Sequence, residues 1–169
     1  ITDELKALGG CDVLVNNAFF WNLKPFREQT WDDLDSFAKV NMVGTTYLTQ
    51  QVIEDMRGHV RGSVIFISSI HEEMVRRLHP PYSMGKAGIK MLVKELSVEY
   101  GPHGIRVNAI APGHVETEEE ERADNPYIPL GGKSALPEDI AKMAVHLASE
   151  ETTGHVTGVS IPVDGGERL

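Results

Sequence analysis

The chain alternates short apolar runs with longer segments whose apolar residues recur every three or four positions. The short runs span five or six residues and lead into polar or turn-forming residues, a pattern typical of strands buried on both faces of a parallel sheet. They predict strands at residues 12–16, 63–68, 105–110 and 159–163.

The longer segments carry the period of amphipathic helices. One helix is expected over residues 30–56, with Thr30 as its N-cap and acidic residues in its first turn. Two more are expected over residues 80–100 and 137–148, each opening at proline. Residues 1–8 are typical of the end of a helix that stops at a Gly-Gly pair.

Strands that alternate with helices imply right-handed crossovers and a parallel sheet with helices on both faces. The sequence therefore predicts an α/β fold with a Rossmann-like, doubly wound sheet. The 169 residues suffice for one domain, and no repeat or linker interrupts them. Residues 116–133 are acidic and rich in turn formers, so we expect a variable segment there.

Composition narrows the classes of partner. The formal net charge of −9 argues against nucleic acid or an anionic membrane surface. Cys11 is the single cysteine and is expected to be a small core residue. No apolar run of membrane-spanning length and no signal peptide is visible, so we expect a cytoplasmic protein. We expect no metal site.

Tyr82 and Lys86 form a pair with a possible chemical role. Their spacing of four residues puts both side chains on one face of the expected helix. A neighbouring ammonium favours tyrosinate, so Lys86 is expected to lower the pKa of Tyr82 toward the range of a general acid/base. The alternative is a surface helix that carries an unrelated Tyr and Lys.

Other polar residues fall where the predicted strands end. Asn16-Asn17-Ala18 follows the first strand, Ser68-Ser69 ends the second, and Pro112-Gly113 follows the third. Ligands of open α/β sheets bind outside the carboxyl ends of the strands. These residues and the Tyr82–Lys86 pair are therefore expected to meet in one site.

The motifs occur in a fixed order along the whole chain. They are Asp12-Val13-Leu14-Val15-Asn16-Asn17-Ala18, the helix with Asn41, Ser69, Tyr82 with Lys86, Gly104-Ile105-Arg106-Val107-Asn108, Pro112-Gly113-His114-Val115-Glu116-Thr117, Val156-Thr157-Gly158 and Val163-Asp164-Gly165-Gly166. With them the chain resembles the carboxyl-terminal two-thirds of a short-chain dehydrogenase/reductase, loosely in the branch of bacterial glucose 1-dehydrogenases and 3-oxoacyl reductases.

The resemblance implies an NAD- or NADP-dependent oxidoreductase that interconverts an alcohol and a carbonyl. It implies that Tyr82 is the general acid/base, that Lys86 tunes Tyr82 and binds the nicotinamide ribose, and that Ser69 holds the substrate oxygen. Asn41 would anchor a water that links Lys86 to solvent. The cofactor contacts implied are Asn16, Ala18, Tyr82, Lys86, Pro112, Gly113, Val115 and Thr117.

Several of these residues also have a purely structural interpretation. Asn41 could be a polar residue on a helix face, and Ser69 could cap the end of a strand. Asn17 and Asn108 are expected to be structural, through bonds from their amides. Asp164, in an Asp-Gly-Gly run, could be a turn former.

The substrate is less defined. Ser69-Ile70-His71-Glu72 resembles the stretch of glucose 1-dehydrogenases in which the histidine faces the sugar, so His71 is a candidate substrate contact; the alternative is an exposed loop histidine. Phe19 stands where the family has glycine, a residue that lets backbone approach the cofactor closely. Phe19, Phe20 and Trp21 could line an apolar pocket or cover exposed surface.

No glycine-rich phosphate-binding turn occurs in the chain, so it is expected to be a partial dinucleotide-binding and catalytic domain over residues 1–169, truncated on its N-terminal side. The first strand would then expose an apolar edge. Three hypotheses follow: a piece of a complete enzyme, a truncated non-catalytic relative that binds another chain, or an enzyme whose other half comes from a separate polypeptide. The resemblance also implies a homodimer or homotetramer that packs through the long helices.

Overall fold

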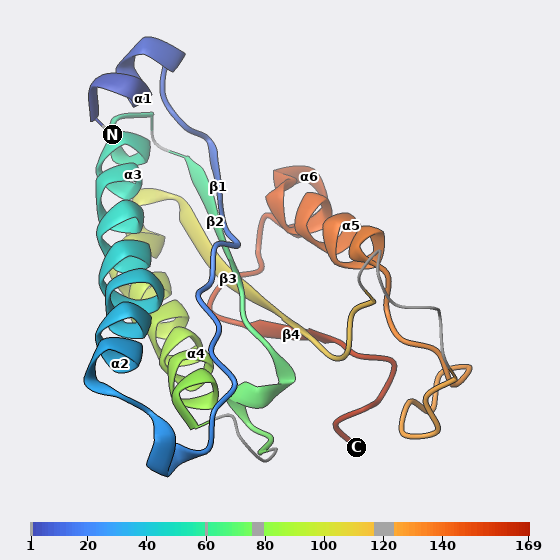
Figure 1. The fold of residues 1–169 in the computed structure, drawn as a ribbon. Coiled ribbons are helices and arrows are strands. Elements are labelled where there is room, and N and C mark those ends of the chain that lie inside the picture. Colours follow the sequence, from blue (N-terminus) through green and yellow to red (C-terminus); the bar gives the residue numbers. More distant parts are fainter. Residues whose placement is uncertain (1, 60, 76–79, 117–123) are drawn as a thin grey trace.

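A four-stranded parallel sheet forms the centre of the molecule, in the order β1-β2-β3-β4 (Figure 1). The computed structural model describes residues 2–59, 61–75, 80–116 and 124–169. The strands are β1 Val13–Asn16, β2 Gly62–Ile67, β3 Ile105–Pro112 and β4 Ser160–Val163. The predicted strands and their parallel arrangement are confirmed.

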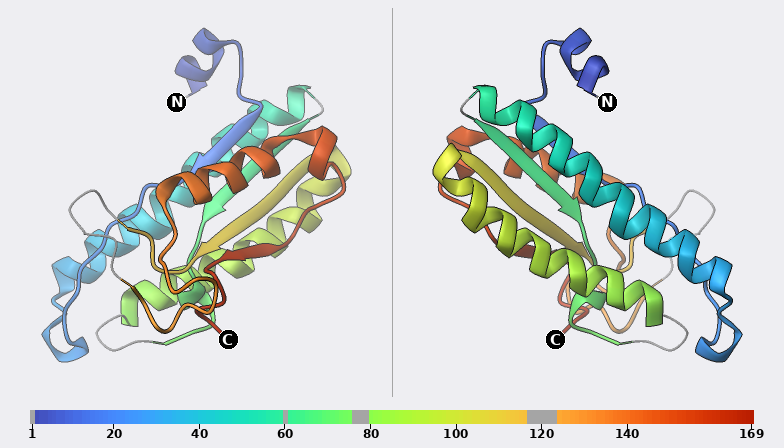
Figure 2. Two further views of the ribbon diagram at one scale, coloured as in Figure 1. Left: turned by 90° about the vertical axis from the view of Figure 1, so that its right-hand side faces the viewer. Right: turned by 90° about the vertical axis from the view of Figure 1, so that its left-hand side faces the viewer.

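Helices cover both faces of this sheet. They are α1 Thr2–Leu8, α2 Trp31–Phe37, α3 Thr45–His59, α4 Pro80–Tyr100, α5 Pro137–Ala148 and α6 Glu150–Thr153. Figure 2 shows α3 and α4 side by side over one face and α5 with α6 over the other. Within the described ranges, none of the helices has the length and apolar character needed to cross a membrane.

Local sequence signals set several helix ends as expected. The Thr30 hydroxyl accepts from the Asp33 amide, and the Asp33 carboxylate accepts from the Thr30 amide, which makes a capping box at α2. Gly10 adopts φ +102° and donates to Leu5, closing α1. The helix predicted over 30–56 is divided: a π-helical turn, Ala38–Gly44, joins α2 to α3.

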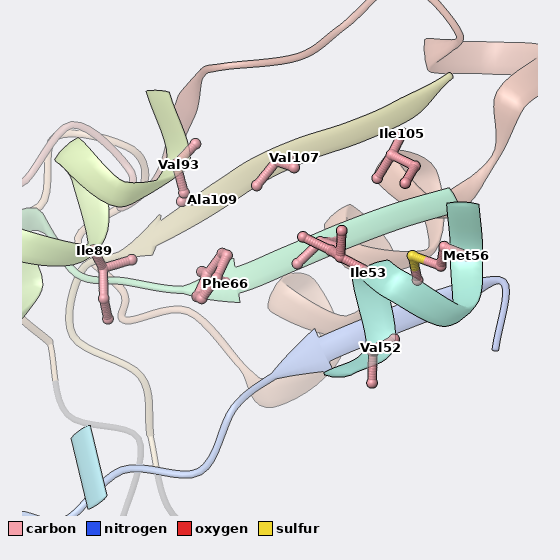
Figure 3. Close-up of a cluster of buried hydrophobic side chains, with 10 residues drawn as sticks. Val52, Ile53, Met56, Phe66, Ile89, Val93, Ile105, Val107 and Ala109 are labelled. Carbon is pink, nitrogen blue, oxygen red and sulfur yellow. The ribbon is translucent and has the colours of Figure 1, made fainter. Parts of the chain in front are cut away.

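The larger apolar core lies between the sheet and α3 and α4. Phe66 and Val107 from the strands pack with Ile53 and Met56 from α3 and Val93 from α4, all at most 2% exposed (Figure 3). A second cluster on the opposite face consists of Ile65, Ile110 and Leu147 with their partly buried neighbours. Alternate residues of β2 and β3 thus point into the two cores. This packing fixes the carboxyl ends of both strands, where the polar residues of the expected site lie.

β1 differs from the prediction in its burial. Val13 and Val15 are 40% and 44% exposed, so the expectation that this strand is buried on both faces is wrong. Among the described residues β1 pairs with β2 on one side only. The expected apolar edge is confirmed.

Candidate active site

A cleft of about 550 Å³ opens at the carboxyl ends of β2 and β3. Its walls come from the segment after β1, the end of β2, the start of α4, the end of β3 and the C-terminal segment. They include Asn17, Phe19, Trp21, Leu23, Ser69, His71, Tyr82, Lys86, Pro112, Gly113, His114, Val115 and Glu167. The cleft therefore brings together residues that lie far apart in the sequence, at the edge of the sheet where a ligand was expected.

Ser69 and Tyr82 meet in this cleft. Ser69 follows β2, is 5% exposed, and its hydroxyl accepts a 3.2 Å hydrogen bond from the His71 amide. That bond caps the 3₁₀ turn Ile70–Glu72 (η3). A side-chain hydrogen bond also joins Ser69 to Tyr82. The capping interpretation of Ser69 and its candidate chemical role thus apply to the same hydroxyl.

Lys86 lies one turn after Tyr82 and is 4% exposed. Its Nζ donates to the Ile67 carbonyl oxygen at 2.8 Å and lies 3.9 Å from the centre of the Phe19 ring. Burial lowers the pKa of Lys86 to about 8, although the negative charge of Glu72 opposes that change. The side chain is thus a buried cation that bonds to backbone and faces an aromatic ring.

The structure does not give the expected lowering of the Tyr82 pKa. Burial of the phenol raises that pKa, and the hydrogen bond with Ser69 only partly offsets it. The Lys86 ammonium bonds to Ile67 and lies 5.6 Å from the centre of the Tyr82 ring. The predicted lowering of the Tyr82 pKa by Lys86 is therefore wrong for this structure, because burial of the phenol outweighs the effects that lower the pKa.

Asn41 lies in the π-helical turn and is 4% exposed. Its amide nitrogen donates to the Phe20 carbonyl at 2.8 Å, and its amide oxygen accepts from the Phe20 amide at 2.7 Å. These two bonds hold the segment after β1 against the helix layer, so Asn41 is more than a polar residue on a helix face. Its water-relay role stays a prediction.

Three rings surround the phenol of Tyr82. Phe19 and His71 lie edge-on to it, at centroid distances of 5.2 and 5.3 Å, and Trp21 is tilted against it at 5.5 Å. Phe19, Trp21 and His71 all line the cleft. Phe19 and Trp21 therefore form an aromatic wall beside Tyr82, as one of the two interpretations of these aromatics predicts. The substrate contact of His71 stays a prediction.

Part of the expected cofactor surface faces the cleft. Pro112, Gly113 and Val115 line it together with Lys86. The Asn16 amide instead donates to the Thr49 hydroxyl at 2.9 Å, which ties β1 to α3. Ala18 is exposed at the start of the loop after β1, and Thr117 lies outside the described residues.

These walls fit the nicotinamide end of a dinucleotide, with one obstacle. The Phe19 ring covers the Lys86 ammonium to which a ribose hydroxyl would bind. Packing also favours glycine at position 113, because a Cβ there would lie 2.6 Å from the Glu167 carboxylate. No group of three His, Cys, Asp or Glu side chains in the described part of the chain could hold a metal ion.

Asn108 is structural, as expected, and Asp164 is a turn former, which is one of the two interpretations of that residue. The Asn108 amide donates to the Val156 carbonyl at 2.9 Å and accepts from the Val159 amide at 3.3 Å, which ties β3 to the approach to β4. The Asp164 carboxylate accepts from the Gly166 amide at 2.9 Å, as in a turn former.

Glu72 contacts the site but was not among the residues expected there from the sequence. Its side chain is 5% exposed, and its carboxylate accepts from the Ser68 hydroxyl at 2.6 Å. The sequence signal for Glu72 is an acidic residue three positions after Ser69, in the turn that follows the buried strand β2.

Comparison with known proteins places this geometry in context. The family model described as enoyl-(acyl carrier protein) reductase matches residues 1–167. Glucose 1-dehydrogenase 2 of Bacillus subtilis is 36% identical over 174 residues, covering 98% of this chain and 67% of that protein. 3beta-hydroxysteroid dehydrogenase 1 of Eggerthella lenta is 35% identical over 173 residues, covering 96% of this chain and 66% of that protein.

Solved structures agree with this grouping. The crystal structure of a gluconate 5-dehydrogenase from Burkholderia cenocepacia, in complex with NADP and tartrate, superposes with a TM-score of 0.89 at 30% identity. The match covers 98% of this chain and 68% of that one. The chain thus spans about two thirds of the length of the proteins it resembles.

Proposed function

Because the chain belongs to the short-chain dehydrogenase/reductase family, we propose that it carries the catalytic part of an NAD- or NADP-dependent oxidoreductase that interconverts an alcohol and a carbonyl. The observation that supports this most is the meeting of Ser69, Tyr82 and Lys86 in one cleft at the end of β2. A hydroxyl pair beside a buried ammonium is suited to moving a proton to or from an oxygen atom.

The proposed chemistry follows from the hydroxyl pair. In the reductive direction, Tyr82 gives its proton to the carbonyl oxygen as that oxygen gains negative charge, and Ser69 donates a hydrogen bond to the same oxygen. In the oxidative direction, Tyr82 takes the hydroxyl proton. Lys86 would bind a ribose hydroxyl of the nicotinamide cofactor and so hold its reacting end beside Tyr82.

A nicotinamide cofactor would accept or supply the hydride. Lys86, Pro112, Gly113 and Val115 would hold its nicotinamide end, because they line the cleft that contains Tyr82. Asn16 and Ala18 would contribute through their backbone, since the Asn16 amide bonds to Thr49. Phe19 must move away from Lys86 for a ribose hydroxyl to reach the ammonium.

The substrate contacts proposed are His71 and the aromatic wall. The names of the relatives cover both a sugar and a steroid, so likeness to them does not select one class. His71 could bond to a substrate hydroxyl, whereas Trp21 presents an apolar face that is 56% exposed. We also propose a cytoplasmic homodimer or homotetramer that packs through α3 and α4, whose outer faces expose Tyr47, Met84 and Met91.

The test is Tyr82→Phe in the complete protein. NAD or NADP reduction is measured spectrophotometrically with a panel of sugars, polyols, hydroxysteroids and simple secondary alcohols. We expect turnover to fall about 10³-fold, since the phenylalanine ring keeps the packing but has no proton to transfer. Tyr127→Phe, at a position that is 77% exposed and outside the cleft, is the matched control and should retain activity. Retained turnover in Tyr82→Phe would refute the role proposed for Tyr82.

A second function, a non-catalytic binding module, is favoured by one observation. Val13 and Val15 on β1 and Val145 on α5 leave apolar surface exposed, next to an apolar groove of about 540 Å³. Such surface is typical of an interface. NAD(P)H fluorescence and intact mass distinguish the two functions: a chain of 18.6 kDa that associates but neither binds NAD(P)H nor turns over substrate supports this alternative.

A further inference from the structure

The carboxylate of Glu72 is buried beneath the candidate site and joins three elements. Its Oε2 accepts from the Ser68 hydroxyl at 2.6 Å and from the Ser160 hydroxyl, on β4, at 3.0 Å. Its Oε1 lies 3.2 Å from the Lys90 ammonium on α4. Buried carboxylates are rare unless they are paired and hydrogen-bonded in this way.

These bonds fix the strand end that carries Ser69. Ser68 precedes Ser69 and is 3% exposed; its amide donates to the Ile110 carbonyl at 2.7 Å while its hydroxyl donates to Glu72. Glu72 also ends the η3 turn that the Ser69 hydroxyl caps. Glu72 therefore closes a short loop of contacts around Ser69, so movement of its carboxylate would move that hydroxyl.

Lys86 depends on Glu72 in a different way. Its ammonium lies against the Ile67 carbonyl and the rings of Phe19 and Tyr82, and these groups carry no net charge. Burial disfavours the ammonium, and the negative charge of Glu72 acts against that, which raises the pKa of Lys86 from where burial alone would leave it.

We propose that Glu72 is a positioning residue of this site: its buried carboxylate, bonded to Ser68 and Ser160 and paired with Lys90, holds Ser69 in place beside Tyr82. The inference rests on the proposed function for its catalytic consequence and on the contacts above for its physical basis.

Other titratable and charged groups surround the same region, on several elements. They are His71 and Glu73 on or beside η3, Tyr82 and Lys90 on α4, His114 and Glu116 after β3, and Asp164, Glu167 and Arg168 after β4. Glu73 is the useful comparison. It neighbours Glu72 and pairs with the same Lys90, but its side chain is 54% exposed and it also faces Arg168 at 3.6 Å.

The experiment compares Glu72→Gln with Glu73→Gln in the complete protein. Each removes one negative charge near Lys90 and keeps the shape of the side chain. The Lys86 titration is followed by side-chain NMR, and the pH profile of kcat is recorded in parallel. We expect Glu72→Gln to lower the Lys86 midpoint by about one pH unit and to move the alkaline loss of activity by the same amount. Glu73→Gln should leave both within about 0.3 unit, because exposed charges act weakly.

A second variant separates charge from position. Glu72→Asp keeps the charge but is one methylene too short to reach both Ser68 and Ser160. We expect its Lys86 midpoint to stay near that of the wild type while kcat falls several-fold and KM changes little. This variant decides the positioning claim even if Glu72→Gln does not fold.

Two results would overturn the inference. One is a Lys86 midpoint in Glu72→Gln equal to that in Glu73→Gln, with only the unfolding temperature lowered, since Glu72 would then be a structural brace alone. The other is wild-type kcat in Glu72→Asp. A wild type that turns over no alcohol or carbonyl would contradict the proposed function instead, and the NMR midpoint would still decide the effect of Glu72 on Lys86.

Discussion

The two walls of the cleft are built in different ways. On the wall formed by the end of β2, η3 and α4, the polar residues Ser68, Ser69 and Lys86 are 3–5% exposed and each has a bonded partner. On the aromatic wall, formed by the segment after β1, large apolar side chains lie at the surface: Trp21 and Leu23 are 56% and 52% exposed.

The two walls therefore have different expected roles: proton transfer on the polar wall and admission of the cofactor on the aromatic wall. The polar wall is an extension of the core, because β2 lies between the two buried apolar clusters and α4 packs in the larger of them. The aromatic wall is held by a few polar contacts, chiefly those of Asn41 and Asp33. We therefore expect substitutions on the polar wall to change turnover most, and those on the aromatic wall to change ligand affinity.

Lys86→Met is the strongest test of the polar wall. Turnover should fall at least about 100-fold, because the ammonium that would bind the cofactor ribose is lost and the cofactor is no longer positioned beside Tyr82. The free energy of unfolding should rise at pH 7 by about 2 kcal/mol, because the wild type must keep a buried ammonium whose pKa is lowered to about 8. Relief of this cost exceeds the loss of the Lys86 hydrogen bond to Ile67.

The difference in unfolding free energy between Lys86→Met and the wild type depends on pH. The folded protein releases the Lys86 proton near pH 8, whereas the unfolded chain keeps it to about pH 10.4. The free-energy cost of the buried ammonium is therefore complete below pH 8 and disappears as the pH rises from about 8 to about 10.4. The unfolding free energies of the wild type and of Lys86→Met should thus converge by about pH 10.5. Urea unfolding at pH 7 and 10.5 measures this, with Lys94→Met on the exposed face of α4 as control. Lower stability of Lys86→Met at pH 7 would contradict the argument.

The same contrast explains what could be predicted from the sequence. The strands, α4 and the Tyr82–Lys86 spacing follow from local signals: short apolar runs, a proline at a helix start, and a period of 3.6 residues. The exposure of Val13 and Val15 does not, because it depends on which strands stand beside β1.

Contacts between distant residues set the remaining details of the site. Ser160 is 88 residues from Glu72, and Asn41 is 21 residues from Phe20, so neither bond is visible in a local pattern. The pKa of Tyr82 was predicted with the wrong sign for the same reason. Spacing places Lys86 near Tyr82, but burial of the phenol decides the direction of the pKa change.

Phe19→Ala tests the aromatic wall with an intermediate effect. Removing the ring uncovers the Lys86 ammonium and ends a cation–π contact worth about 0.5–2 kcal/mol, which cofactor binding must otherwise break. We expect the Kd of NADH or NADPH to decrease about 2- to 30-fold, measured by fluorescence titration of the complete protein. Phe26→Ala, on the exposed turn Phe26–Glu28, is the control in the same loop. Weaker cofactor binding by Phe19→Ala would mean that the ring supports the cofactor rather than covering its site.

Asp33→Asn should have the smallest effect and shows how the aromatic wall is tethered. The Asp33 carboxylate accepts from Lys24 at 2.8 Å, from the Asn22 amide at 2.6 Å and from the Thr30 amide at 3.0 Å, which joins the loop to the first turn of α2. The bond to Lys24, and then those to Thr30, hold the pKa of Asp33 well below its usual range. This stabilisation is complete above about pH 4, the ordinary value for aspartate, and is lost as the pH falls toward the lowered pKa.

The variant should therefore lower the unfolding temperature by a few degrees at pH 7 and by less at pH 2, and speed hydrogen exchange at the start of α2, while turnover changes less than twofold. Asp32→Asn, one residue away and exposed, is the matched control. Should Asp33→Asn reduce turnover as much as a substitution on the polar wall, the two walls would be mechanically coupled through α2 and the π-helical turn, and the aromatic wall would belong to the catalytic framework rather than to ligand binding alone.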